Sequence, residues 1–293
     1  YFFTLQIFRK FEIEKEKAPG GIIKTITKEA LSIFEIPYPE NIKEQTAIAT
    51  ALSDTDALIE KLGKLVAKKK AVKLGAMQQL LTGKKRLPGF SGEWDKKPMQ
   101  EIGKTYGGLS GKVKADFGNG NSSYIPFMNI MSNPIIDITY FDKVNIKTNE
   151  TQAKAQKNDL FFNGSSETPE EVGMCSVLLN EIPNLYLNSF CFGFRLNKDL
   201  ETDGLWLSYF FRSSIGRELI YSLAQGATRY NLSKTNFLKL IIPYPEPEEQ
   251  TAIATVLSDI DAEIEKLENK LNKYRQVKTG MMQQLLTGKI RLI

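Results

Sequence analysis

Apolar side chains recur about every 3.5 residues along two stretches of the chain, which is the repeat of a helix that packs against a partner along a narrow seam. In residues 250–292 the two apolar columns hold Ile253, Ile260, Leu267, Tyr274, Met281, Leu257, Ile264, Leu271 and Leu285. In residues 45–87 the same columns hold Ile48, Leu52, Ile59, Leu62, Val66 and Leu80. The columns are interrupted by Thr55, Lys69, Lys73 and Lys278. The pattern predicts two long helices, each of which needs a partner helix.

Both predicted helices carry start and stop signals. Pro247 is followed by two glutamates, and proline and carboxylates both favour a first helical turn. Asn41 and Glu44 have the spacing of a capping box. Gly83 and Gly288 are placed to end the helices in a left-handed conformation. Roughly forty residues at about 1.5 Å each predict rods of about 60 Å.

The two helical stretches are copies of one another. Gln45–Leu87 recurs as Gln250–Leu292 with 29 of 43 positions identical, and the IPYPE sequence of Ile36–Glu40 recurs at Ile242–Glu246. Two copies in one chain are natural partners, so we expect an antiparallel coiled coil with a pseudo-twofold axis. The alternative is a coiled coil that serves only as a spacer or an oligomerisation device.

Residues 88–241 show a different pattern, with short strand-like runs followed by a helical one. The expected strands are Tyr124–Met131, Ile135–Tyr140, Asp159–Phe162, Gly173–Leu179 and Phe190–Leu196. The last run alternates phenylalanine and leucine with Cys191, Gly193 and Arg195, which predicts a half-buried strand. Leu205–Leu223 has the apolar spacing of a helix. The fold class is therefore α+β, a globular domain joined to two long helices.

Two polar segments of this region carry residue types that suit DNA. Gly226–Lys234 holds Thr228, Arg229, Tyr230, Asn231, Ser233 and Lys234. Arginine can bond guanine and asparagine can bond adenine, each with two hydrogen bonds, and a tyrosine ring can stack or bond phosphate. The alternative is a loop in which Ser233 caps a short helix.

The second segment, Asn163–Thr168, offers short hydrogen-bonding side chains at Asn163, Ser165 and Ser166. Its alternative interpretation is a simple turn.

A glycine-rich stretch, Gly107–Gly111, is flanked by Lys104, Lys112 and Lys114. It is not a P-loop, because Tyr106 stands where the first glycine of that motif is required. We expect Lys112 and Lys114 to follow DNA phosphates.

Composition narrows the function classes. The 293 residues are 42% apolar, which is ample for a core, and hold two cysteines and no histidine. The missing histidine removes the commonest general base and metal ligand, so any chemistry would need carboxylates, cysteine or lysine. We expect no catalysis, no metal and no cofactor. The net charge is +5, and the excess of basic groups lies in residues 41–87, with ten basic against four acidic groups. The few cysteines and the lack of a long apolar run predict a cytoplasmic location.

The repeated helix ending QQLLTGKxRL, alternating with a region that closes on GATRYNLSK and IPYP, resembles the specificity subunit of type I restriction-modification systems. The resemblance covers essentially the whole chain. It implies target-recognition domains that each read one half of a split site in double-stranded DNA. It also implies helical regions that bind methyltransferase subunits, which in turn recruit restriction subunits.

The resemblance divides the chain into four expected parts: residues 1–40 as the C-terminal remnant of a first target-recognition domain, 41–87 as the first repeated helix, 88–241 as a complete target-recognition domain, and 242–293 as the second repeated helix. A first domain without its body suggests a partial protein or gene cassette, or a half-type subunit that acts as a homodimer. A coiled-coil adaptor without a DNA role is a further alternative. An enzyme is disfavoured because the Asn/Asp-Pro-Pro-aromatic motif of amino-methyltransferases is missing.

Overall fold

The computed structural model describes residues 1–17, 32–33, 35–226 and 229–292. They form two compact units. The helical unit comprises Tyr1–Ala71 and Ala262–Ile293, and the mixed unit comprises Val72–Asp261. The two predicted long helices are present as α3 (Ile42–Leu80) and α9 (Pro247–Leu285), and each continues from one unit into the other.

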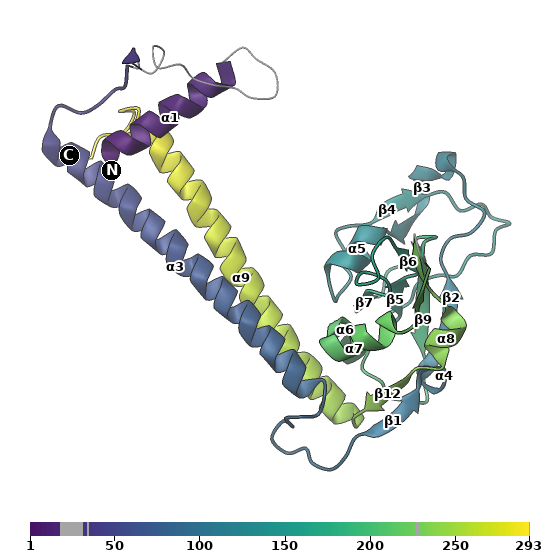
Figure 1. The fold of residues 1–293 in the computed structure, drawn as a ribbon. Coiled ribbons are helices and arrows are strands. Elements are labelled where there is room, and N and C mark those ends of the chain that lie inside the picture. Colours follow the sequence, from purple (N-terminus) through teal and green to yellow (C-terminus); the bar gives the residue numbers. More distant parts are fainter. Residues whose placement is uncertain (18–31, 34, 227–228, 293) are drawn as a thin grey trace. The chain divides into compact units, whose positions relative to one another are not determined.

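Within the helical unit, α3 and α9 pack side by side in opposite directions. Three ion pairs join them in reverse sequence order: Asp56 to Lys278 at 2.5 Å, Lys69 to Glu263 at 2.6 Å, and Lys70 to Glu268 at 2.7 Å. A third helix, α1 (Phe2–Lys17), packs against the start of α3 and the end of α9, where Phe2, Ile48, Leu52 and Leu285 form a core (Figure 1). The apolar columns supply this core because they face one another.

The polar interruptions of the apolar columns have partners across the helix pair. Lys69 and Lys278 form two of the ion pairs above, and Lys73 bonds Asp261 at 2.6 Å in the mixed unit. The Thr55 hydroxyl donates to the Ala51 carbonyl and lies 3.6 Å from the Met281 sulfur. A buried seam accepts a charge only when an opposite charge meets it, and these pairs supply that charge.

The helix ends agree with three of the four predicted signals. The second helix begins at Pro247, and both Gly83 and Gly288 have positive φ, at 70° and 71°. The capping box at Asn41 is wrong, because only half of it forms. The Asn41 side chain accepts from the Lys43 amide at 2.9 Å, whereas the Glu44 carboxylate pairs with Arg291. Arg291, which follows the end of α9, carries a full charge and attracts that carboxylate more strongly than a neutral backbone amide does.

The mixed unit contains four small sheets and several short helices. Its strands are β1 (Asp95–Pro98), β2 (Gly103–Gly107), β3 (Phe117–Ile125), β4 (Asp142–Val144), β5 (Leu160–Asn163), β6 (Ser165–Ser166), β7 (Cys175–Val177), β8 (Leu185–Leu187), β9 (Cys191–Leu196), β10 (Ala224–Gln225), β11 (Tyr230–Leu232) and β12 (Ile241–Tyr244). Its helices are α4 (Met99–Ile102), the 3-10 helix η1 (Lys114–Asp116), α5 (Phe127–Ser132), α6 (Gly204–Arg212), α7 (Ser214–Tyr221) and α8 (Lys234–Leu238). The sheets have the strand orders β2-β9-β5-β7, β4-β3-β8, β10-β11-β6 and β1-β12.

The sheet β2-β9-β5-β7 separates two apolar clusters. Phe162, Phe192 and Phe194 belong to the larger cluster, and Phe161 and Cys191 belong to the smaller one. The predicted half-buried strand at Phe190–Leu196 is therefore wrong in one respect, because β9 is covered on both faces. Small residues at Cys191 and Gly193 permit this second layer, since the Tyr106 ring occupies the place of a Gly193 side chain.

Three predicted elements of the mixed unit differ from the structure. Residues 127–132 form α5 and not strand, and of the run 135–140 only Ile135 makes a bridge, to Val177. The expected helix at 205–223 is broken into α6 and α7 at Ser213, whose side chain caps the second piece. Serine competes for backbone amides, so it ends one helix and starts the next.

Within the ranges that the structure describes, no helix combines the length and the apolar character that crossing a membrane requires.

Candidate nucleic-acid interface

The two polar segments selected from the sequence lie next to each other in the mixed unit. Strand β11 pairs antiparallel with β6, so that Tyr230 faces Ser166 and Asn231 faces Ser165. The Leu232 amide extends the contact by donating to the Gly164 carbonyl at 2.9 Å. Segments more than sixty positions apart in the sequence therefore form one polar surface, and the exposed Asn231 side chain belongs to it.

Arg229, which directly precedes β11, lies at this surface. Gly226 has a φ of 134°, and a side chain there would collide with the Arg229 carbonyl oxygen. Only glycine fits both restrictions. Thr228, which the sequence also placed at the interface, lies outside the described residues. Arg229 itself is exposed, and its carbonyl accepts a hydrogen bond from the Asn231 amide group at 3.2 Å.

A hollow beside this pairing collects side chains from both polar segments. Its lining consists of Phe127, Ser165, Ser166, Glu167, Glu171, Phe190 and Arg229. The Ser166 hydroxyl donates to the Glu171 carboxylate at 3.1 Å, and the Phe190 ring is 63% exposed. One cation, two carboxylates, two hydroxyls and an exposed ring make this surface a mixed one, with groups for hydrogen bonding and for stacking.

Phe127 reaches the hollow from α5, and a partly buried arginine fixes that helix. The Arg212 guanidinium donates to the backbone carbonyls of Ile130, Asn133 and Cys175. Burial lowers the pKa of Arg212 to about 10, so the group stays charged at neutral pH and needs these oxygens. The contact ties the end of α5 to strand β7.

Asn163 has a structural role, and the expectation that it contacts DNA needs correction. Its side chain is fully buried. Its amide donates to the carbonyls of Ser165 and Glu171, and its oxygen accepts from the Met174 amide at 2.6 Å. Both N–H groups of this amide are used within the loop, and the buried side chain is out of reach of a base.

The expectation that Lys112 follows DNA phosphates also needs correction. Its side chain is only 3% exposed, because its ammonium group pairs with Glu150 and donates to the Asn145 carbonyl at 2.6 Å. Lys114, two positions on, is exposed in η1. Of these two lysines, only Lys114 is therefore available to a phosphate.

Lys234 stands at the first position of α8, and Ser233 caps that helix by accepting from the Asn236 amide. The alternative interpretation, in which Ser233 caps a short helix, is therefore confirmed. The Lys234 ammonium lies 6.0 Å from the centre of the Phe192 ring and close to Gly107, so it is near the start of the glycine-rich stretch. The lysine itself is exposed.

Three residues of the hollow lie outside the two segments selected from the sequence: Phe127, Glu171 and Phe190. Phe190 was assigned to the buried face of a strand, but the strand begins one residue later. The Asn188 side chain accepts from the Phe190 amide at 2.9 Å and turns the chain there. Asparagine directly before the strand was the signal that could have indicated this turn.

Neither cysteine belongs to this surface, and both are buried. Burial raises the pKa of the Cys191 thiol to about 12, which keeps it neutral. Among the residues that the structure describes, no group of three or more Cys, Asp or Glu side chains is placed to hold a metal ion.

Comparison with known proteins gives a consistent result. The family described as type I restriction modification DNA specificity domain matches residues 92–274. The type I restriction enzyme MjaVIII specificity subunit of Methanocaldococcus jannaschii is 25% identical over 327 residues, which cover 99% of this chain and 70% of that protein.

Two solved structures share the mixed helix and sheet fold. The type I restriction-modification system S subunit from M. genitalium aligns with a TM-score of 0.59 at 17% identity, over 97% of this chain and 71% of that one. A chain from a structure concerned with complex assembly and conformational transition of the type I R-M system aligns with a TM-score of 0.58 at 16% identity, over 96% and 68%. The family match covers well over half of the sequence, and the resemblance noted in the repeated motifs is confirmed. The chain belongs to the type I restriction-modification DNA specificity family.

Proposed function

We propose that this chain selects the DNA target of a type I restriction-modification complex, and that the β6–β11 surface reads the bases. The observation that carries the proposal is the strand pairing of Ser165 and Ser166 with Asn231 and Tyr230, beside the exposed Arg229. Family membership supports a DNA role, and this surface concentrates groups that can distinguish bases.

The chemistry of the surface suits base edges better than phosphates. Arg229 can donate two hydrogen bonds to a guanine, and Asn231 can exchange two with an adenine. Glu171 and Glu167 would repel a phosphate, whereas a carboxylate can accept from a cytosine amino group. Lys114 and Lys234, both exposed, are the proposed phosphate contacts, and Tyr230 would stack or bond phosphate.

We further propose that α3 and α9 form an antiparallel coiled coil with pseudo-twofold symmetry, which spaces recognition domains along DNA. Two kinds of ion pair support this by occurring twice. Arg86 bonds Glu249 in the mixed unit as Arg291 bonds Glu44 in the helical unit. Lys73 bonds Asp261 as Lys278 bonds Asp56. In each case both partners are shifted by the repeat distance, as a twofold axis between the helices requires.

In this proposal the domain boundaries are those expected from the sequence, with a complete recognition domain at residues 88–241 and a remnant at 1–40. Methyltransferase subunits are the proposed partners of the helices, and restriction subunits would join through them. The chain itself would carry no catalytic step. The structural relative from a type I assembly supports a role within a complex.

Arg229 provides the test. The preferred duplex is first selected from a random-sequence library with the whole chain, and binding to it is then measured across a salt series. We expect Arg229→Ala to weaken binding to the selected duplex by roughly 1–3 kcal/mol and to leave binding to unrelated duplexes nearly unchanged. Arg275→Ala, which removes an exposed arginine of α9 in the helical unit, is the matched control. Equal binding of the Arg229 variant and the parent at matched salt would refute the assignment. Failure to enrich any duplex would favour the adaptor alternative.

A further inference from the structure

Phe190 is an aromatic residue held at the surface beside the proposed base-reading strands. It is 63% exposed, although the strand β9 that begins one position later is covered on both faces. A single exposed ring is common on proteins. What distinguishes Phe190 is how firmly its backbone is held and which groups lie next to its ring.

Hydrogen bonds fix the backbone of Phe190 from both sides. Its amide donates to the Asn188 side chain at 2.9 Å, and its carbonyl accepts from the Gly164 amide at 2.9 Å. The Gly164 carbonyl in turn accepts from the Leu232 amide at 2.9 Å. A side chain on Gly164 would meet the Phe190 carbonyl oxygen at 3.1 Å, so glycine permits this close approach. Phe190 is therefore tied to the residue between β5 and β6 and, through it, to β11.

A second ring reaches the same surface from another element. Phe127 and Phe190 both line the hollow that also contains Arg229. Phe127 follows Pro126 at the start of α5, and Arg212 holds the other end of that helix. Two rings on separately fixed elements thus place apolar surface beside an arginine that can bind a base.

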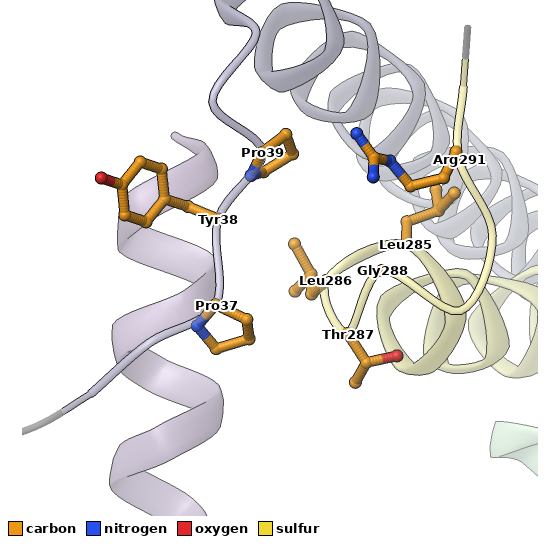
Figure 2. Close-up of a pocket in the computed structure, with 8 residues that line it drawn as sticks. All are labelled: Pro37, Tyr38, Pro39, Leu285, Leu286, Thr287, Gly288 and Arg291. Carbon is orange, nitrogen blue, oxygen red and sulfur yellow. The ribbon is translucent and has the colours of Figure 1, made fainter.

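The hollow at the end of α9, in the helical unit, shows how similar residue types can be unavailable (Figure 2). Its lining also contains an arginine and a tyrosine. Arg291, however, is paired with Glu44, and the Tyr38 ring points away from the hollow. The hollow of the mixed unit differs because its rings and its arginine line one surface.

The apolar surface can be matched to one chemical group of DNA. The paired hydrogen bonds proposed for Arg229 and Asn231 are made in the major groove, where guanine and adenine present the required atoms. Phe190 lines the same hollow as Arg229, so its ring would face the same groove. The C5-methyl group of thymine is the apolar group that base pairs present there, and a phenylalanine ring can pack against it.

We propose that Phe190 and Phe127 pack against the methyl group of a thymine, and that this contact makes the chain select thymine at one position of its target. Phe190 provides most of the contact, because its ring is exposed whereas Phe127 is half-buried. The proposal rests on the function proposed above, in which the β6–β11 surface reads bases. It adds a residue that distinguishes bases by shape and apolar contact where Arg229 and Asn231 do so by hydrogen bonds.

The test uses the whole chain and the duplex selected for it, with uracil replacing each thymine of both strands in turn. Uracil lacks only the methyl group, so the hydrogen bonds that the base pair offers stay the same. We expect one replacement to weaken binding about fourfold, which is the effect of losing one buried methyl group, and the others to change binding little.

Three variants assign this thymine preference to Phe190. Phe190→Ala should bind the thymine and uracil duplexes equally, whereas Phe190→Leu keeps an apolar contact and should retain part of the preference. Tyr221→Ala is the matched control and should keep the full preference, since Tyr221 is 55% exposed in α7 and does not line this hollow. The preference is a ratio of two affinities, so it can be measured even for a variant that binds DNA more weakly.

Two results would overturn the inference: uracil that binds like thymine at every position, or a thymine preference that Phe190→Ala keeps. If uracil has no effect and a mismatch opposite one thymine strengthens binding, the ring stacks on an extruded base instead, which also refutes the methyl contact.

Failure of this inference can be told apart from failure of the proposed function. If Arg229→Ala weakens binding and no uracil replacement does, the base-reading surface stands and the thymine contact is refuted. If Arg229→Ala binds as the parent does and Phe190→Ala loses the thymine preference, the thymine contact stands and the assignment of Arg229 is refuted.

Discussion

The IPYPE sequence occurs in both units, with very different surroundings. Tyr244 of the mixed unit is buried, and its hydroxyl lies 2.6 Å from that of Thr202. Tyr38 of the helical unit is mostly exposed. The backbone contacts nevertheless agree, because Gln45 donates to the Pro39 carbonyl at 2.7 Å and Gln250 donates to the Pro245 carbonyl at 2.8 Å. The motif therefore specifies its own link to the helix, while its burial depends on β1.

A second repeated sequence, Tyr-Phe-Phe, extends the comparison. Tyr209 donates to Asp261 in the mixed unit, and Tyr1 donates to Asp56 in the helical unit. The third residue differs, since Phe211 is fully buried among aromatic rings and Phe3 is 46% exposed. Identical local contacts thus coexist with an aromatic core in one unit and an exposed ring in the other.

The largest expected effect separates these two phenylalanines. Phe211 packs against Phe162 with ring centres 5.3 Å apart and against Phe237 at 5.7 Å. We expect Phe211→Ala to lower the free energy of unfolding by about 4 kcal/mol, because it leaves a cavity in the core. Phe3→Ala should cost less than about 1 kcal/mol, since nearly half of the residue is already exposed to water. Urea unfolding followed by tryptophan fluorescence for the first and by circular dichroism for both measures the difference. Similar losses would contradict the comparison.

The next effect compares the two buried glutamates. Glu249 accepts hydrogen bonds from Arg86 and from the Trp94 indole, and the Arg86 side chain is only 20% exposed. Glu249→Gln should destabilise the mixed unit by about 3 kcal/mol, because it leaves a partly buried cation without its counter-ion. The matched change Glu44→Gln should cost clearly less, since water can solvate the more exposed Arg291. Equal shifts in the denaturation midpoints of the two variants would show that Trp94 and burial do not distinguish the two glutamates.

The smallest effect is a pH dependence of the helical unit. The hydrogen bond from Arg291 holds the pKa of Glu44 below its usual value of 4.5. A carboxylate with a lowered pKa stabilises the fold above its unfolded pKa and loses that contribution as the pH falls through the folded one. Urea midpoints measured by circular dichroism from about pH 6 to about pH 3 should therefore fall, and Glu44→Gln should flatten the slope near the acidic end. A slope unchanged by Glu44→Gln would contradict this role.

Much of the helical framework could be predicted because its signals are local. Pro247, Gly83 and Gly288 mark helix ends through backbone restrictions that act within a few residues. The apolar columns predicted the buried seam. The lysines that interrupt these columns pair with acidic residues of the other helix, and the sequence could not assign those partners. The mixed unit was less predictable, because the short strand-like runs at 124–131 and 135–140 carry apolar residues that pack equally well in a helical turn or a loop.

The candidate site shows the same division. Arg229, Tyr230 and Asn231 were selected by residue type, and Ser165 and Ser166 were selected independently, but their adjacency follows only from the pairing of β11 with β6. Asn163 and Lys112 have the right chemistry and the wrong location, since a neighbouring carbonyl or carboxylate satisfies each of them inside the fold. Phe190 shows the reverse case. It was expected in the core, but a turn before β9 places it at the surface.

The sequence by itself determined the duplication, the two long helices with their ends, and the family, because these depend on residue spacing and on identical motifs. Tertiary structure decided which copy of a motif is buried and which polar side chains are free for a ligand. The physical reason is that burial and pairing depend on neighbours distant in sequence. Tyr38 and Tyr244 share the same local sequence, and they differ because β1 covers only one of them.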